Sequence, residues 1–364
     1  MTVTAPEWYE AVCATPRHVL VPRWWEPIPD SYPFVWGVLA PDQERPWAQV
    51  YADETLVTRV GALHADDAKA GDRASGLPTS SSTLPGLIVH MLHLLDPQPG
   101  QRVLDVGTGS GYSAAVLSHR LGDERVTSVD VDSYLVEAAR KRFASFGRVP
   151  RLEVADATGH LPDGRYDRIV ATVSVRPIPQ SWLNALQPGG RIIATIVGTS
   201  LPISADMGDD GIARGHIQAD PASFMRTRRT ADYPARLDDV YAAARDAPGD
   251  DVRELDRRVP DLWTDWSLRS LHELDSPDIE NRSATLDDGS EIVWLLADDG
   301  SWARAEESSG TIQQGGPRRL WDDLERVQRT WEEAGRFPLH QLVVELATDR
   351  STLTSPDGSW TFTL

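Results

Sequence analysis

A segment in the middle of the chain has the residue types of a nucleotide-binding loop. Residues 102–112 read RVLDVGTGSGY, which is an apolar strand, then glycines at alternate positions, then the start of a helix. Glycines in such a loop let the backbone turn sharply and approach a ligand where any Cβ would collide with it. The loop alone does not identify the ligand, because nicotinamide-binding folds use a similar turn with the spacing G-x-G-x-x-G.

Aspartates around this loop favour S-adenosylmethionine over a dinucleotide. Asp105 precedes the first glycine by two residues, where its carboxylate would attract the positive amino-acid end of that cofactor and oppose a pyrophosphate. Asp130 can accept hydrogen bonds from both ribose hydroxyls, and Asp156, beside Ala157, can accept one from the adenine amino group. Taken singly, each aspartate could be a helix cap or a turn residue. All follow predicted strands, where open α/β sheets bind ligands, so we predict S-adenosylmethionine as cofactor and S-adenosylhomocysteine as product.

Alternating helix-like and strand-like segments must position these residues. The pattern from residue 86 to 200 predicts a parallel sheet covered by helices on both faces. We expect helices over residues 86–95, 112–121, 133–146 and 180–186, and strands over residues 102–106, 126–130, 152–154, 167–172 and 191–197, the last fed by a turn at residues 187–190. The predicted fold is therefore α/β, a Rossmann-like doubly wound sheet of the class I methyltransferase type.

Composition changes towards both ends of the chain, which predicts three parts. Residues 236–307 carry 20 acidic and 8 basic side chains, and Asp-Gly pairs there separate short strand-like runs. Residues 317–334 form an amphipathic helical pattern, and residues 339–347 and 360–364 look like strands. We predict an N-terminal helical or extended segment (1–75), a cofactor-binding domain (76–235) and an acidic, Trp-rich α+β domain (236–364).

Charge and cysteine usage exclude several kinds of partner. The net charge of −19 opposes nucleic acid and anionic membranes as main partners, and no apolar run is long enough to cross a bilayer. Cys13 is the one cysteine, so no disulfide framework or thiolate metal cluster is expected. His64, His90 and His93 do not have the spacing of metal ligands. The N-terminus has no export signal, which favours a cytoplasmic setting. The oligomeric state is left open.

Three further segments carry a family resemblance. Residues 14–22 read ATPRHVLVP, residues 50–53 read VYAD and residues 80–85 read SSSTLP. They resemble the PRxxFVP, AYxD and QTISQP motifs of the protein-L-isoaspartate O-methyltransferase family, and the last lies at the family's distance from the glycine loop. Residues 166–167 and 187–191 also fit, and the resemblance covers roughly residues 8–230.

The resemblance implies which residues carry the chemistry. In that family the signature serine lies beside the methyl donor and the substrate carboxylate, and Thr83 takes its place here with its hydroxyl retained. A carboxylate has a pKa near 4 and is already a nucleophile at neutral pH, so the site needs no general base but must align the reactants and exclude water. Thr83 could instead cap the following helix, and its neighbours could be ordinary loop residues. The predicted catalytic residues are Thr83, Ser82 and Ser81, and the predicted cofactor-binding residues are Ser80, Asp105, Gly107, Thr108, Gly109, Ser110, Gly111, Tyr112, Asp130, Val131, Asp156 and Ala157.

Two departures from the family suggest a specialised substrate. The chain inserts residues between Thr58 and Thr79 and extends far beyond the family's usual end. It thereby resembles the family's branch in graspetide, lanthipeptide and lasso peptide maturation, which esterifies a normal aspartate of a constrained peptide on the way to an aspartimide. We therefore predict a modified precursor peptide as partner, recognised by the additions. The C-terminal part could instead cover a sheet edge or form a dimer interface. The alternatives in function are isoaspartyl repair, a nicotinamide oxidoreductase and a non-enzymatic binding protein.

Overall fold

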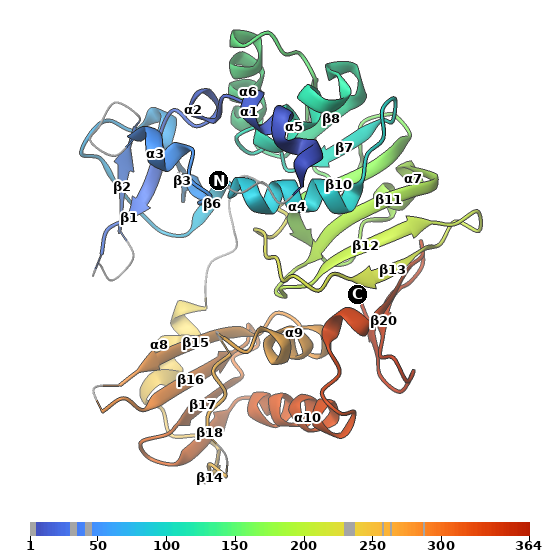
Figure 1. Ribbon diagram of the computed structural model, residues 1–364. Coiled ribbons are helices and arrows are strands. Elements are labelled where there is room, and N and C mark those ends of the chain that lie inside the picture. Colours follow the sequence, from blue (N-terminus) through green and yellow to red (C-terminus); the bar gives the residue numbers. More distant parts are fainter. Residues whose placement is uncertain are drawn as a thin grey trace.

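A central sheet dominates the computed structural model, and each end of the chain adds a smaller sheet (Figure 1). The structure describes residues 5–29, 35–40, 46–228, 237–256, 258–262, 264–286 and 288–364. The predicted boundary between residues 235 and 236 lies outside the described residues.

The parallel half of the central sheet has the predicted Rossmann-like order. Its strands are β7 (Val103–Val106), β8 (Val126–Asp130), β9 (Arg151–Val154), β10 (Tyr166–Val175) and β11 (Leu186–Ile196). They lie side by side as β9-β8-β7-β10-β11, all parallel. The strand order reverses between β7 and β10, and open α/β sheets bind ligands at the carboxyl ends of strands beside such a switch point. The predicted turn at residues 187–190 lies within β11 as an irregularity in its pairing with β10.

Helices cover this half because the strand residues alternate between two apolar clusters. Val170 of β10 packs with helices α4 (Pro85–Leu95), α5 (Tyr112–Leu121) and α6 (Ser133–Ser145), whereas Ile169 and Ala171 pack with α7 (Gln180–Ala185) and the C-terminal part. This alternation is that of a strand buried on both faces. The short 3-10 helix η3 (Asp123–Arg125) joins α5 to β8.

The second half of the central sheet is antiparallel and is completed by the end of the chain. The strands β12 (Pro202–Met207) and β13 (Ala213–Ile217) extend it from β11, and β19 (Val343–Leu346), β20 (Ser351–Thr354) and β21 (Thr361–Thr363) follow β13. The first residues of the strand predicted over 339–347 form the 3-10 helix η4 (Leu339–Gln341) instead.

The segment between β13 and β19 forms a separate α+β unit, which is smaller than the domain predicted over residues 236–364 because the last three strands join the central sheet. An antiparallel sheet has the order β14 (Asp251–Glu254), β18 (Thr311–Gly315), β17 (Trp302–Glu306), β16 (Glu291–Leu296), β15 (Glu280–Thr285). Its residues alternate between α8 (Asp238–Asp246) on one face and α9 (Trp266–Asp275) with α10 (Leu320–Glu333) on the other. Buried positions of α10, among them Trp321, Leu324 and Val327, confirm the amphipathic helix.

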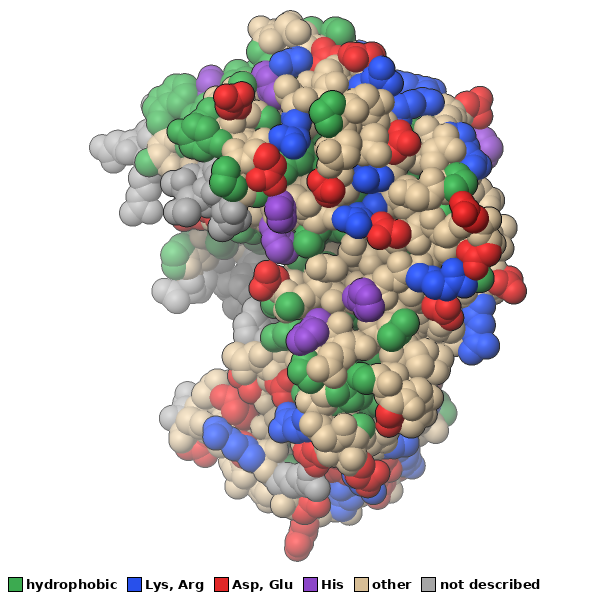
Figure 2. Space-filling model, turned by 45° about the vertical axis from the view of Figure 1, so that its right-hand side comes forward, with side chains coloured by type: hydrophobic (Ala, Val, Ile, Leu, Met, Phe, Trp, Pro, Cys, Tyr) green, Lys and Arg blue, Asp and Glu red, His purple; other side chains and the backbone are tan. Residues whose placement is uncertain are grey.

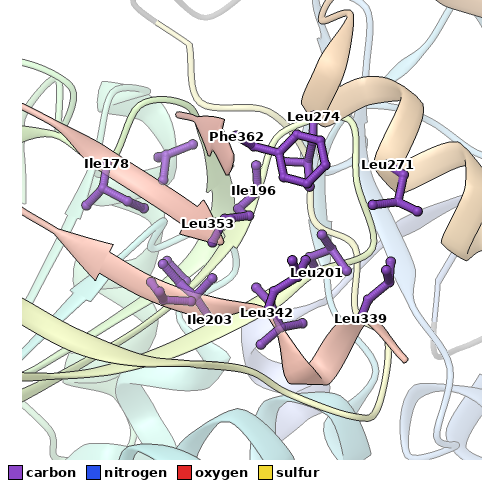
Figure 3. Packing of buried hydrophobic residues seen from close by; sticks show 14 of the residues in the cluster. Ile178, Ile196, Leu201, Ile203, Leu271, Leu274, Leu339, Leu342, Leu353 and Phe362 are labelled. Carbon is purple, nitrogen blue, oxygen red and sulfur yellow. The ribbon is translucent and has the colours of Figure 1, made fainter. Parts of the chain in front are cut away.

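One apolar core joins this C-terminal part to the central sheet. Figure 3 shows Leu271 and Leu274 of α9 and Phe362 of β21 beside Ile196 and Leu201 of the central sheet, and all of them are buried. Deleting the C-terminal part would remove three strands and expose the edge of β13. Such a deletion therefore cannot separate peptide recognition from folding.

The N-terminal part is a small sheet that reaches into the predicted cofactor domain. Its strands are β1 (Trp24–Pro27), β2 (Val35–Leu39), β3 (Leu56–Val60), β4 (Leu63–His64), β5 (Arg73–Ser75) and β6 (Pro78–Ser82), accompanied by the helices η1 (Pro6–Trp8), α1 (Tyr9–Ala14), α2 (Arg17–Leu20), α3 (Pro46–Val50) and η2 (Ala65–Asp67). The predicted insertion between Thr58 and Thr79 is the stretch from β3 to β6, which pair with each other. Because β6 carries the predicted signature residues, this sheet forms one wall of the site described next.

Candidate active site

A cavity of about 260 Å³ lies at the carboxyl ends of β7, β8 and β10. The remaining walls are the end of β6 with the start of α4, and the segment over residues 223–228. Of the predicted site residues, those that line the cavity are Ser80, Ser81, Ser82, Thr83, Gly107, Thr108, Gly109, Ser110, Tyr112, Asp130, Val131 and Ala157. The structure thus brings the glycine loop and the signature together across one cavity.

The glycine loop packs closely against both neighbouring walls. A Cβ on Gly107 would lie 2.9 Å from Cγ1 of Val173, and one on Gly109 would lie 3.3 Å from the carbonyl oxygen of Ser81. Both glycines have a positive φ, of 98° and 50°, which residues other than glycine rarely adopt. The loop is therefore shaped to keep its backbone against the cavity. Gly111 does not line it, because this residue turns the loop into α5 and packs on Phe143.

The carboxylate of Asp130 lies at the floor of the cavity and holds the loop. Its Oδ2 accepts a hydrogen bond from the backbone N–H of Gly109 at 2.9 Å, and its Oδ1 accepts one from that of Asp132 at 3.0 Å. Burial raises the pKa of Asp130, and these backbone hydrogen bonds oppose that shift. Each carboxylate oxygen has two lone pairs, so Asp130 keeps acceptor capacity for a ligand's hydroxyls.

The predicted direct role of Asp105 needs correction. This residue is fully buried and does not line the cavity. Its Oδ1 accepts from the Ser113 hydroxyl at 2.8 Å and its Oδ2 accepts from that of Ser128 at 2.7 Å. Burial raises the pKa of Asp105 to about 6, although both hydrogen bonds act in the opposite direction. The side chain therefore supports the loop from behind, and any influence on a ligand acts through its charge.

Asparagine at position 105 is expected to change stability in a pH-dependent way. With a folded pKa near 6 and an unfolded value near 4, the carboxyl group stabilises the fold at low pH and loses that contribution as pH rises through 6. Asp105→Asn should therefore gain up to about 3 kcal/mol in unfolding free energy relative to wild type between pH 4 and pH 7. Denaturant unfolding across this range measures the difference. A difference independent of pH would contradict the assignment.

Asp156 also differs from its predicted role. It is half-buried, and its Oδ1 accepts from the backbone N–H and the hydroxyl of Thr158, at 2.9 and 2.6 Å. Asp156 does not line the cavity, whereas Ala155, Ala157 and Thr158 do. In this arrangement Asp156 shapes the turn after β9, and its neighbours form the cavity wall.

The signature residues differ in how free their hydroxyls are. The hydroxyl of Ser80 accepts a hydrogen bond from Thr58, and that of Ser82, which is buried, accepts from the Nε of Arg17. Thr83 is half-buried in the cavity wall, and its hydroxyl has no hydrogen-bond partner among the described residues. Ser81 also lines the cavity half-buried, and its hydroxyl likewise has no hydrogen-bond partner among the described residues. Within the signature, the hydroxyls of Ser81 and Thr83 are therefore the two that are available to a ligand.

Thr83 does not cap the following helix, which removes its structural alternative. The N-cap position of α4 is Leu84, with no side-chain hydrogen bond of its own. Asp53 instead accepts from the backbone N–H of Gly86 at 2.6 Å, and the Thr55 hydroxyl accepts from that of Leu84 at 3.1 Å. The motif at residues 50–53 thus caps α4 and leaves Thr83 at the cavity.

Arg17 has a central position that the sequence did not reveal. It is 1% exposed and donates hydrogen bonds to the carbonyl oxygens of Val50, Ala52 and Glu54 from one side and of Ser82 and Thr83 from the other. Burial lowers the pKa of Arg17 to about 10, which leaves it charged at neutral pH. The motif at residues 14–22 therefore fixes the backbone on which Thr83 lies.

The segment over residues 223–228 was also missed. It runs beside the end of β10, where Ser174 donates from its N–H to Met225 and accepts from the N–H of Thr227, both at 2.8 Å. Arg226 and Arg228 line the cavity from this segment, and Asp130 is the one carboxylate among the described lining residues. No periodicity or motif in the sequence points to this wall.

The described part of the chain contains neither a candidate metal site nor a candidate membrane-spanning helix. Within those ranges no group of three His, Cys, Asp or Glu side chains is arranged to hold a metal ion. None of the helices found there combines the length and apolar character needed to cross a bilayer.

Comparisons with known proteins point to one family. A family model described as Protein-L-isoaspartate(D-aspartate) O-methyltransferase (PCMT) matches residues 74–205. A protein-L-isoaspartate O-methyltransferase 2 of Rhodopseudomonas palustris is 37% identical over 164 residues, which cover 43% of this chain and 73% of that protein. A protein-L-isoaspartate O-methyltransferase of Methanopyrus kandleri is 39% identical over 116 residues, covering 31% and 51%. The chain spans about half the length of several curated relatives that it matches.

One solved structure has a similar fold over nearly the whole chain. A protein-L-isoaspartate O-methyltransferase structure aligns with a TM-score of 0.51 and 17% identity, over 99% of this chain and 95% of that one. At this identity the likeness concerns the fold alone, and it confirms the predicted fold class.

Proposed function

Because the chain belongs to the protein-L-isoaspartate O-methyltransferase family, we propose that it transfers a methyl group from S-adenosylmethionine to the free carboxylate of L-isoaspartyl residues in peptides or proteins. The observation that carries this proposal is the contact between the two motifs: the glycine loop lies against the backbone of the signature, with Thr83 in the same cavity.

The residues around the cavity fit the cofactor. Asp130 offers acceptor lone pairs for the ribose hydroxyls, and the glycine loop keeps its backbone close enough for contact with the amino-acid end. Bound S-adenosylmethionine supplies an electrophilic methyl group on a positively charged sulfur. Asp105 would lower the energy of that positive charge from behind the loop. It lies close to the loop, because the Ser128 hydroxyl is hydrogen-bonded both to Asp105 and to Thr108.

On the acceptor side, the main task of the site is to orient the substrate carboxylate. An isoaspartyl carboxylate is ionised at neutral pH, so the protein has no proton to remove. The Thr83 hydroxyl would donate a hydrogen bond to this carboxylate and hold one oxygen towards the methyl group. Arg17 fixes the carbonyl groups on both sides of that position, which limits the motion of Thr83.

The prediction that the substrate is a modified precursor peptide has no support from the structure or from the comparisons, and it stays a prediction. It rested on the added C-terminal part, yet a protein named for isoaspartate methylation aligns over 99% of this chain. The acidity of that part also forms no single patch in Figure 2, where acidic and basic side chains are intermixed on the visible face. Arg253, for example, pairs with Asp322 and Glu325. Repair of isoaspartyl residues is the better supported reading.

Mass spectrometry of an isoaspartyl peptide incubated with the protein and S-adenosylmethionine tests this function. We expect the gain of one methyl group at the isoaspartyl residue as a base-labile ester, and none when NAD replaces the methyl donor. A peptide that remains unmodified, with the cofactor bound, would contradict the proposal.

A further inference from the structure

An ion pair joins the C-terminal part to the wall of the candidate site. Arg226, which lines the cavity, donates a hydrogen bond to Asp278 in the turn after α9. The Arg226 side chain is 44% exposed, so it lies where the cavity opens to solvent. A residue of the added part thus holds a charged residue of the cavity wall.

The turn that carries Asp278 is fixed to the strand ends behind the cavity. Arg176, directly after β10, donates to the carbonyl oxygens of Glu273 and Leu274 at 2.6 and 2.9 Å. The Glu273 side chain packs on Gly198 and accepts from the backbone N–H of Asp278 at 3.3 Å. Hydrogen bonds thus connect both the turn of Asp278 and the segment of Arg226 to the end of β10.

The two arginines of this wall face different groups. Burial raises the pKa of Asp130, and the positive charge of Arg228 is one of the influences that lower it, so Arg228 lies near that carboxylate. Arg226 is paired at the outer side with Asp278. The Arg226 guanidinium is thus accessible to a peptide carboxylate that enters from solvent.

Building on the proposed methyl transfer, we propose that Arg226 attracts and orients the isoaspartyl carboxylate at the cavity opening, and that Asp278 is the positioning residue that holds Arg226 there. A guanidinium can contact two carboxylates at once, because its N–H donors lie on more than one edge. The pair is exposed and contributes little to stability, so its value lies in the placement of the charge. The C-terminal part thereby completes the peptide site.

Peptide binding in the presence of S-adenosylhomocysteine tests this inference without requiring turnover. We expect Arg226→Gln to weaken the Kd of an isoaspartyl peptide about three- to tenfold, and Asp278→Asn to weaken it about two- to fivefold. The double variant should bind like Arg226→Gln alone, because Asp278 acts through Arg226. Arg226→Lys should recover part of the loss.

Further measurements distinguish this role from a structural one. The variants should keep the cofactor Kd and the melting temperature of wild type, and the peptide whose carboxyl is already a methyl ester should bind wild type and Arg226→Gln alike. Asp210→Asn, in the comparably exposed pair with Arg214, should leave the peptide Kd unchanged.

The outcomes separate the two proposals. Unchanged peptide affinity in both single variants, or tighter binding by Asp278→Asn, would overturn this inference alone. A wild type that binds the isoaspartyl peptide but never methylates it would overturn the proposed function, and a wild type that does not bind it would overturn both.

Discussion

Replacing Thr83 by alanine is expected to slow methyl transfer by about one to three orders of magnitude, the range for losing a positioned polar group at a reaction centre. The hydroxyl lies in the cavity wall without a partner in the described part of the chain and does not cap α4. Its loss should therefore leave folding and cofactor affinity intact. Single-turnover kinetics at saturating cofactor, together with calorimetric cofactor binding, measure the two quantities.

Two neighbouring variants control for this result. Thr83→Ser keeps the hydroxyl and should retain most of the rate. Ser82→Ala removes a hydroxyl that already accepts from Arg17 and should reduce the rate less. Unchanged turnover in Thr83→Ala would move the acceptor site elsewhere in the cavity.

Arg17→Met is expected to lower the free energy of unfolding by at least about 3 kcal/mol, because several buried carbonyl groups lose their donor at once. The side chain is fully enclosed, and its hydrogen bonds join residues 50–54 to the backbone of Ser82 and Thr83. Arg17→Lys should recover only part of this loss, since an ammonium group cannot span both sets of carbonyls. Denaturant unfolding measures the change.

The same variant should also lose activity per folded molecule, since the backbone at Thr83 is no longer fixed. Arg214→Met, at an exposed ion pair, is the matched control and should leave stability nearly unchanged. An Arg17→Met protein with normal stability, or one with reduced stability and normal turnover per folded molecule, would contradict the role given to Arg17.

The parallel half of the fold could be predicted because its signals are local. The helix over Tyr112–Leu121 and the strand over Val126–Asp130 have the predicted bounds, set by a glycine loop and by continuous apolar runs. The sheet of the N-terminal part depends on pairing between segments such as β3 and β6, which local patterns specify poorly. For the same reason β19 and β21 were predicted as strands but not as members of the central sheet, and β20 was not predicted.

For the site, the sequence predicted which segments meet at the cavity better than it predicted where individual side chains point. Asp105 lies two residues after Val103, which packs under the helices, so the period of two in a strand places both side chains on the same buried face. The spacing from Val103 thus indicates a buried side chain at position 105 and not one that points beyond the strand end. The role of Arg17 and the wall over residues 223–228 arise from contacts between distant segments, for which the sequence carries no local pattern.

The most direct test of the central claim is a competition between an isoaspartyl peptide and its twin with a normal aspartate at the same position, with both peptides and S-adenosylmethionine in one reaction. If the chain is an isoaspartyl methyltransferase, kcat/KM for the isoaspartyl peptide should exceed that of the twin by at least about tenfold. Preferential methylation of the normal aspartate would contradict the account and would restore the constrained-peptide reading.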